Sequence, residues 1–220
     1  MISPIKLIKD YNYCLYRSRT ETNYFERSLF HKIWFNDKVL KSSPLDAGLP
    51  WMTYNVIFFL NSILKGNEIA FETGCGGSTI FYLERIKSLF SIEHESSWLE
   101  KIKRDKRILK YSKKWNYSHC NLNKSIDNNV SNSQYLQRLN ELPNNTFHLG
   151  SIDGRLRSQS LIISSRKIRK GGYLLLDNSD RVEYKEGINY LERLGWNRKE
   201  FLGLCYCYDW DSSTTVWQNM

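Results

Sequence analysis

The chain has 220 residues, of which 41% are hydrophobic and 14% aromatic, so it can bury a substantial core and is not disordered as a whole. Its 32 Lys and Arg against 23 Asp and Glu give a net charge of +9, which permits an acidic partner without requiring one. Scattered cysteines without CxxC pairs argue against a disulfide or zinc framework, and apolar runs no longer than residues 56–60 argue against a membrane span, which needs roughly 18 residues.

The N-terminal region, residues 1–45, is interpreted as a helical extension ahead of a main domain at 46–220. Apolar Leu29, Phe30, Ile33 and Trp34 have helical spacing and predict an amphipathic helix over residues 24–35. We expect this helix to pack on the main domain; a membrane-surface helix or a substrate lid are the alternatives. No signal peptide is recognisable, and the cysteine usage favours a cytoplasmic protein.

A glycine-rich turn dominates the next part of the chain. A helix is predicted over residues 53–64 with Gly66 as its cap, then a strand over 68–72 and a second helix to about residue 87. Between strand and second helix, three glycines allow a sharp turn and a close ligand, and two hydroxyl residues supply a helix cap. The turn comprises Glu72, Gly74, Gly76, Gly77, Ser78 and Thr79. This pattern predicts a nucleotide site; a purely structural turn is the alternative.

The second predicted strand, residues 89–93, ends in Glu93-His94-Glu95. Glu93 lies 19 positions after Gly74, close to the separation of about 20 at which nucleotide-binding βαβ units place a carboxylate on the ribose. We therefore predict that Glu93 binds ribose hydroxyls. The alternative is an ordinary acidic residue at a strand end.

Residues 101–114 hold eight basic residues against one acidic residue, Asp105. Such a run would contact phosphates, particularly with aromatic side chains beside it, although a solvated helix face is the commoner explanation. The eight are Lys101, Lys103, Arg104, Lys106, Arg107, Lys110, Lys113 and Lys114.

Strands and helices alternate through the rest of the chain. The pattern predicts strands at 115–120, 146–152, 173–176, 196–204 and 214–218, helices at 134–142, 156–170 and around Ile188 to Leu194, and a helix end at Gly171-Gly172. We expect an α/β fold with a Rossmann-like, mostly parallel seven-stranded sheet, helices on both faces and a C-terminal antiparallel hairpin.

The glycine motif, Glu93 and the closing strand pair together resemble the class I S-adenosylmethionine-dependent methyltransferases over residues 50–218. Ser78 stands where a third alternating glycine is often found in that family. A dinucleotide dehydrogenase fits less well, because its fingerprint requires a small residue where Thr79 stands. Similarity to a broader group of methyltransferases extends to Leu49-Pro50-Trp51.

By this resemblance the cofactor is S-adenosylmethionine. The implied binding residues are Glu72, Gly74, Gly76, Gly77, Ser78, Thr79, Glu93, His94, Cys120, Asn121 and Asp153. The glycine motif would hold the methionine part, Glu93 the ribose, and residues 119–121 the region around adenine.

The acceptor side is predicted from two later strand ends, which supply Asp153, Asp177 and Asn178 as catalytic residues. Their pattern is similar to that of the cation-dependent O-methyltransferases acting on caffeoyl-CoA and catechols, which implies that these three side chains hold a magnesium ion. Gly154-Arg155 stands where those enzymes tend to carry a lysine. Without a cation, Asp153 or Asp177 would take the acceptor's proton directly; both could instead only satisfy loop backbone.

Arg155, Arg157 and Arg181 follow the same strand ends and would hold an anionic acceptor, or pair with Asp180 and Glu183. The predicted activity is methyl transfer from S-adenosylmethionine to a hydroxyl oxygen of a small molecule, such as a sugar or phenolic metabolite. A nucleic-acid methyltransferase that uses residues 101–114 and a noncatalytic binding protein that retains the fold remain as alternatives.

Overall fold

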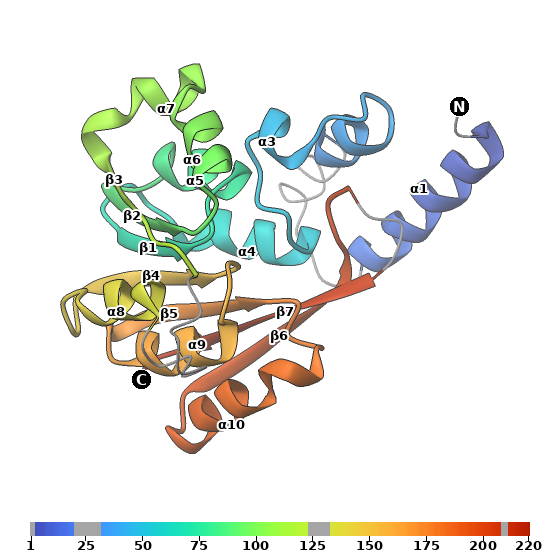
Figure 1. Cartoon of the computed structure of the whole chain (residues 1–220). Helices are drawn as coiled ribbons and strands as arrows, with labels where there is room; N and C mark the ends of the chain where they lie inside the picture. The colour runs from blue at the N-terminus through green and yellow to red at the C-terminus, as the bar shows by residue number, and fades with distance from the viewer. Residues whose placement is uncertain (1–2, 20–31, 123–132, 208–210) are drawn as a thin grey trace.

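The computed structural model describes residues 3–19, 32–122, 133–207 and 211–220. These residues form a seven-stranded sheet in the order β3-β2-β1-β4-β5-β7-β6 (Figure 1). The strands are β1 Ile69–Thr73, β2 Ser88–Glu93, β3 Trp115–His119, β4 Phe147–Ile152, β5 Ile168–Asp177, β6 Asn197–Leu204 and β7 Asp211–Gln218. β1 to β5 pair in parallel, and β7 pairs antiparallel with both β5 and β6. The predicted α/β fold and its C-terminal hairpin are confirmed.

The register of the sheet brings three strand ends to one level. Thr73 of β1 pairs with Ile92 of β2 on one side and with Ile152 of β4 on the other. The strand order reverses between β1 and β4, and ligands of open α/β sheets bind outside the carboxyl ends of strands at such a reversal. The residues that follow these three pairing positions therefore line the expected binding crevice.

Helices cover both faces of the sheet. Their bounds are α1 Pro4–Arg19, residues 32–38, α3 Pro44–Ala47, α4 Tyr54–Ile63, α5 Gly77–Leu83, α6 Ser96–Lys103, α7 Lys106–Lys110, η1 Ser112–Lys114, α8 Gln134–Asn140, α9 Arg157–Ser165, η3 Val182–Tyr184 and α10 Lys185–Arg193. One core contains buried residues of 32–38 and of α4 to α7, and the other lies under α8, α9 and α10 (Figure 1). The central strands are buried on both faces, which explains why β1 reads as an almost continuous buried run.

Three predicted helix ends are wrong, and the first is that of the helix predicted to about residue 87, which ends at Leu83. The helix predicted over 156–170 ends at Ser165, because Ile168 already pairs with Phe147, and Gly171-Gly172 lies inside β5. Gly66 is not the cap of α4, which ends in an extended Leu64; instead, the Gly66 N–H donates to Glu68. At the end of α9, pairing with a distant strand outweighs the local helix signal, whereas at Gly66 the backbone N–H is bound by the nearby side chain of Glu68.

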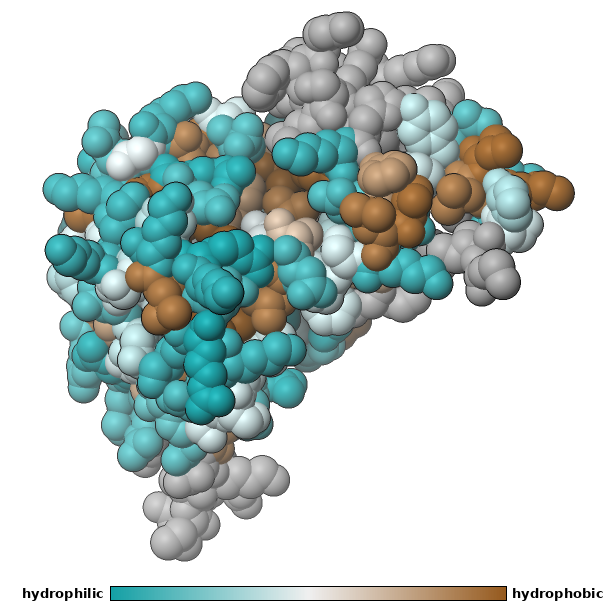
Figure 2. All heavy atoms as spheres, turned by 90° about the horizontal axis from the view of Figure 1, so that it is seen from above, coloured by the Kyte–Doolittle hydropathy of each residue, from teal (hydrophilic) through white to brown (hydrophobic). Residues whose placement is uncertain are grey.

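The N-terminal region packs on the main domain where the structure describes it. Ile33 and Trp34 are buried as predicted, whereas Leu29 and Phe30 lie outside the described residues. Apolar side chains gather at the end of the molecule that carries α1 (Figure 2), and Ile5 and Ile8 of this helix are exposed. Within the described ranges, no helix combines the length and apolar character that a membrane crossing requires.

Candidate cofactor and acceptor site

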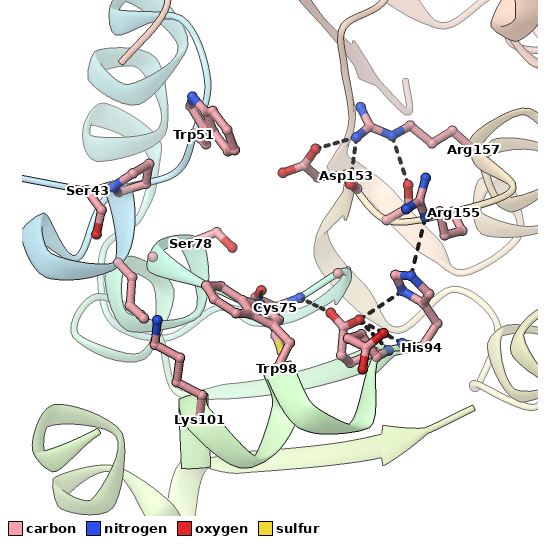
Figure 3. Close-up of a pocket in the computed structure, with 18 residues that line it drawn as sticks. Ser43, Trp51, Cys75, Ser78, His94, Trp98, Lys101, Asp153, Arg155 and Arg157 are labelled. Atoms are coloured by element: carbon pink, nitrogen blue, oxygen red, sulfur yellow. Dashed lines mark hydrogen bonds and ion pairs between the residues drawn. The ribbon is translucent and has the colours of Figure 1, made fainter. Parts of the chain in front are cut away.

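A cavity of about 780 Å³ opens at the carboxyl ends of β1, β2 and β4 (Figure 3). Four parts of the chain form its walls: the segment around α3, the glycine loop after β1, the end of β2 with α6, and the loop after β4. The lining residues are Ser43, Pro44, Leu45, Trp51, Gly74, Cys75, Gly76, Gly77, Ser78, Glu93, His94, Glu95, Trp98, Lys101, Asp153, Gly154, Arg155 and Arg157. This is the crevice that the strand order predicts.

The three glycines of the loop have different roles. Gly74 has a φ of +82°, and a Cβ there would lie 3.1 Å from the Gly154 backbone, so the loops after β1 and β4 touch. A Cβ on Gly77 would lie 2.2 Å from the Leu49 and Pro44 carbonyl oxygens. A Cβ on Gly76 would approach only Trp98, at 3.8 Å. Gly76 is therefore the glycine that leaves room for a ligand, whereas the other two allow close packing of the chain.

Glu72 supports this loop from behind and does not line the cavity. Its carboxylate is 1% exposed and accepts hydrogen bonds from three hydroxyls: Ser78 at 2.7 Å, Thr79 at 2.5 Å and Ser91 at 2.7 Å. Thr79 Oγ1 in turn accepts from the Gly76 N–H at 2.9 Å. Burial raises the pKa of Glu72 to about 7 despite the three donors. Glu72 and Thr79, both predicted as cofactor-binding residues, are thus placed behind the loop, and only Ser78 of this group reaches the cavity.

Glu93 links the glycine loop to the end of β2 and also lines the cavity. Its Oε2 accepts from the Cys75 N–H at 3.0 Å, and its Oε1 accepts from the N–H groups of His94 and Glu95, both at 2.8 Å. Backbone donors on both sides of one carboxylate hold the two loops in a fixed relation. Glu93 is the acid predicted from the spacing to Gly74, and the structure places it beside the loop as expected.

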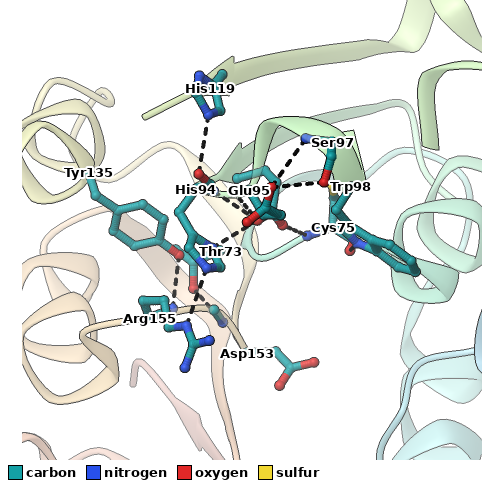
Figure 4. A network of polar contacts seen from close by, with 12 residues as sticks. Thr73, Cys75, His94, Glu95, Ser97, Trp98, His119, Tyr135, Asp153 and Arg155 are labelled. Atoms are coloured by element: carbon teal, nitrogen blue, oxygen red, sulfur yellow. Dashed lines mark hydrogen bonds and ion pairs between the residues drawn. The ribbon is translucent and has the colours of Figure 1, made fainter. Parts of the chain in front are cut away.

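His94 contacts both Glu93 and Arg155, and Figure 4 shows its ring beside Arg155. Its Nε2 accepts from Arg155 Nε at 3.3 Å, and its Nδ1 lies 2.8 Å from Glu93 Oε1. His94 Nδ1 makes no hydrogen bond in spite of this short distance, so the contact with Arg155 is the hydrogen bond that orients the ring. Arg155 therefore reaches the cofactor side of the cavity through His94, although it was predicted as an acceptor-binding residue.

Trp98 and Trp51 form aromatic walls of the cavity, and neither was predicted as a site residue. Trp98 Nε1 donates to the Cys75 carbonyl at 2.6 Å, which fixes the ring beside the glycine loop, and Lys101 Nζ lies 5.0 Å from the ring centroid. Trp51, 45% exposed, faces the opening from the side opposite Asp153 (Figure 3). Trp98 lies in the first turn of α6, shortly after Glu93. An aromatic residue so close to the predicted ribose-binding carboxylate could have been predicted as a cofactor contact.

The predicted adenine-side residues lie outside the cavity lining. Cys120 is buried and its N–H donates to the Glu93 carbonyl at 2.9 Å, so it continues the sheet edge. Asn121 is exposed and lies next to residues 123–132, which are outside the described part of the chain.

The acceptor-side residues separate into two groups. Asp153 lines the cavity with a side chain that is 29% exposed, whereas Asp177 is 2% exposed and accepts from Thr214 Oγ1 at 2.8 Å. Asn178 does not line the cavity either; its Nδ2 donates to Ser212 at 3.2 Å. Arg181 is exposed and also outside the lining. Of the three predicted catalytic residues, Asp153 alone reaches the cavity.

These residues do not fit a magnesium ion. The guanidinium of Arg157 lies between the two strand ends, with Nη2 2.7 Å from Asp153 Oδ1 and Nη1 3.7 Å from Asp177 Oδ2. No cluster of three or more His, Cys, Asp or Glu side chains arranged to bind a metal occurs among the described residues. The lysine of the cation-dependent enzymes has no room here, because a Cβ on Gly154 would lie 2.0 Å from the Tyr135 hydroxyl.

Solved structures of low sequence identity share this fold. Cofactor-bound Rv0187 from MTB matches with a TM-score of 0.55 and 13% identity over 86% of this chain and 95% of that one. Precorrin-6y C5,15-methyltransferase from Geobacter metallireducens matches with a TM-score of 0.54 and 12% identity over 74% and 86% of the two chains. The chain has the class I methyltransferase fold.

The fold alone does not determine the reaction. Spermidine synthase from Thermotoga maritima also matches, with a TM-score of 0.54 and 11% identity over 74% of this chain and 59% of that one. No protein-family model and no curated protein matches the sequence. These structures do not support the resemblance to caffeoyl-CoA and catechol O-methyltransferases.

Proposed function

We propose that the protein transfers a methyl group from S-adenosylmethionine to a hydroxyl oxygen of a small molecule. The observation that carries this proposal is the meeting, in one cavity, of an open glycine loop, a strand-end carboxylate and a second carboxylate from the neighbouring strand. These are Gly76, Glu93 and Asp153, and they follow the aligned ends of β1, β2 and β4.

The cofactor half of the cavity fits a nucleoside with a charged tail. Gly76 leaves open space at the loop, Glu93 has lone pairs for ribose hydroxyls, and Trp98 offers a fixed aromatic face for a base. When bound, S-adenosylmethionine would supply a methyl group that its sulfonium already activates. The known methyltransferase with this fold and the cofactor-bound structure support this reading.

The acceptor half needs mainly to position and deprotonate a hydroxyl group. Asp153 is the carboxylate on the cavity wall, and Trp51 faces it across the opening (Figure 3). An aromatic wall opposite a carboxylate suits a ring-shaped acceptor, whose face stacks on Trp51 while a hydroxyl donates to Asp153. Asp153 would take the proton of the acceptor hydroxyl, and the bound cofactor would supply the methyl group.

The basic run at 101–114 gives limited support to a nucleic-acid acceptor. Arg107 donates to the Asp46 and Leu45 carbonyls and pairs with Asp105, so it fastens α7 to α3. Lys103 pairs with Glu100 at 2.6 Å, and Lys114 donates to the Ile86 carbonyl. Three of the eight basic residues therefore have partners within the protein, which reduces the charge that the run could offer to phosphates.

Calorimetry with S-adenosylmethionine tests the proposal. We expect the wild type to bind, and Gly76→Val to raise Kd at least tenfold, about 1.4 kcal/mol, because its side chain enters the open part of the loop. A Cβ at Gly76 meets no atom closer than 3.8 Å, and thermal unfolding measured beside the calorimetry shows whether the variant is folded. Absence of binding by folded wild type refutes the proposal, and equal binding by Gly76→Val refutes the location of the site.

The acceptor itself is sought with labelled cofactor and a metabolite extract. Asp153→Asn should keep cofactor affinity within about twofold and lose at least 100-fold in turnover, a typical size for removal of a general base. Full turnover by this variant would remove Asp153 from the proposed chemistry.

A further inference from the structure

Arg157 is the most completely bound charged side chain at the acceptor end of the cavity. It begins α9, directly after the loop that follows β4, and its side chain is 11% exposed. A guanidinium has five N–H donors in a fixed fork and keeps its charge at any working pH. The acceptors of these five N–H groups therefore show which parts of the chain Arg157 holds together.

All five donors have acceptors, and four of them lie at the ends of β4 and β5. Nη2 donates to the Asp153 carbonyl and to Asp153 Oδ1, both at 2.7 Å. Nη1 donates to the Asp177 carbonyl at 2.7 Å and to Asn178 Oδ1 at 3.2 Å. Nε donates to the Gly154 carbonyl at 3.0 Å. One side chain therefore joins both strand ends through backbone and side chain together.

Two of these acceptors, Asp153 Oδ1 and Asn178 Oδ1, belong to side chains that the sequence offered as ligands of a hard cation, and the carboxylate of the third, Asp177, lies 3.7 Å from Nη1. Carboxylate, amide and carbonyl oxygens from two neighbouring strand ends are what magnesium selects. In this protein the positive charge between the ends of β4 and β5 is the guanidinium of Arg157. Ile152 pairs with Leu176, so the two aspartates that follow are neighbours and would repel each other without that charge.

We propose that Arg157 takes the position of a divalent cation at this centre, so that the site works without a bound metal and Arg157 holds Asp153 in place for the acceptor. Oδ1 of Asp153 is bound to Arg157, which leaves Oδ2 for a ligand in the cavity. Arg157 is a positioning residue in this arrangement. The part that concerns the acceptor rests on the proposed function; the part that concerns the metal does not.

Titration with Mn²⁺, followed by calorimetry and by water proton relaxation, tests the proposal without cofactor or acceptor. Wild type should show no saturable binding with a Kd below about 1 mM, a weak limit for oxygen-ligand sites. Arg157→Gln should gain binding at least tenfold tighter than that of wild type, because it leaves two neighbouring carboxylates without their counter-charge. Adding Asp153→Asn to this variant should abolish the gain.

Arg155→Gln is the matched control: it removes an arginine from the same cavity, but one that contacts His94 and neither aspartate. It should gain no Mn²⁺ binding, and neither should Arg157→Lys, which keeps the charge. Failure of folded Arg157→Gln to gain binding contradicts the proposal.

Saturable binding by wild type that Asp153→Asn removes contradicts it too, and this test holds even if Arg157→Gln does not fold. Cofactor binding is measured separately, so failure of either proposal is distinguishable from failure of the other.

Discussion

Glu72 is a carboxyl group at the end of β1 whose three partners are all hydroxyls of the surrounding structure. Ser91, one of them, also accepts from Trp115 Nε1 at 2.8 Å, so the network extends from the glycine loop to β3. Burial raises the pKa of Glu72 from 4.5 to about 7. The folded protein therefore holds a proton on Glu72 over a pH range in which the unfolded chain has lost it.

This pKa predicts the sign of a pH effect on stability. Between pH 4.5 and 7 the folded state binds more protons than the unfolded state, so Glu72's contribution to the free energy of unfolding falls as pH rises. Glu72→Gln should remove this contribution. Relative to wild type, the variant should gain on the order of 3 kcal/mol between pH 4.5 and 8, measured by urea unfolding at each pH.

Exposed Glu186→Gln provides the control, because its difference from wild type should stay constant over the same pH range. A constant difference for Glu72→Gln as well would show that Glu72 titrates equally in the folded and unfolded chain, and the buried network would have no influence on its proton.

The sequence identifies the residues whose spacing reflects the βαβ unit. It does not predict whether the side chain of each residue points into the cavity or towards a neighbouring strand. Gly76 and Glu93 lie in the cavity as predicted because the turn and the strand end fix their positions. Asp177 is the last residue of β5, as Glu93 is of β2, yet its carboxylate is covered by β7 and accepts a hydrogen bond from Thr214. Whether a polar strand end faces a cavity or a neighbouring strand depends on tertiary pairing, which local spacing does not contain.

At the scale of elements, Lys167 explains why α9 stops before the predicted end. Its ammonium donates to the Asn140 and Leu142 carbonyls and to Asn144 Oδ1, at 2.7, 2.7 and 2.8 Å. The side chain is 3% exposed and binds the end of α8 and the loop after it. The sequence pattern predicted that the helix continues to residue 170, but the Lys167 side chain turns inward and β5 begins at the next residue.

Lys167→Met should therefore destabilise the fold although the replacement has similar length. Three buried or partly buried oxygens lose a charged donor, which should cost about 3 kcal/mol in the free energy of unfolding. Lys170→Met, an exposed lysine three positions later, should change it by less than about 0.5 kcal/mol. If denaturant unfolding gave equally small changes for Lys167→Met and Lys170→Met, water would be replacing the Lys167 ammonium without a loss of stability.

At the scale of the whole molecule, buried residues from both sides of the predicted boundary at residue 45 share one core. Ile33 and Trp34 belong to the same buried cluster as α4 and α5. Asp37 is 6% exposed; it accepts from the Tyr54 hydroxyl and, at 3.0 Å, from the Cys207 N–H, and Lys38 lies 3.6 Å away. The helical segment 32–38 thus contacts both the first helix of the main domain and the turn after β6.

We expect the chain to unfold in one transition and Asp37→Ala to lower its free energy of unfolding by about 3 kcal/mol. The substitution leaves a buried hydroxyl and a backbone N–H without their charged acceptor, and both belong to elements of the main domain. Exposed Asp180→Ala should have little effect. Urea unfolding followed by tryptophan fluorescence and by circular dichroism should give coincident curves whose midpoint falls in Asp37→Ala with an unchanged slope. If the N-terminal extension were a separate unit, it would unfold at a lower urea concentration than the main domain. Asp37→Ala would then shift only that first transition.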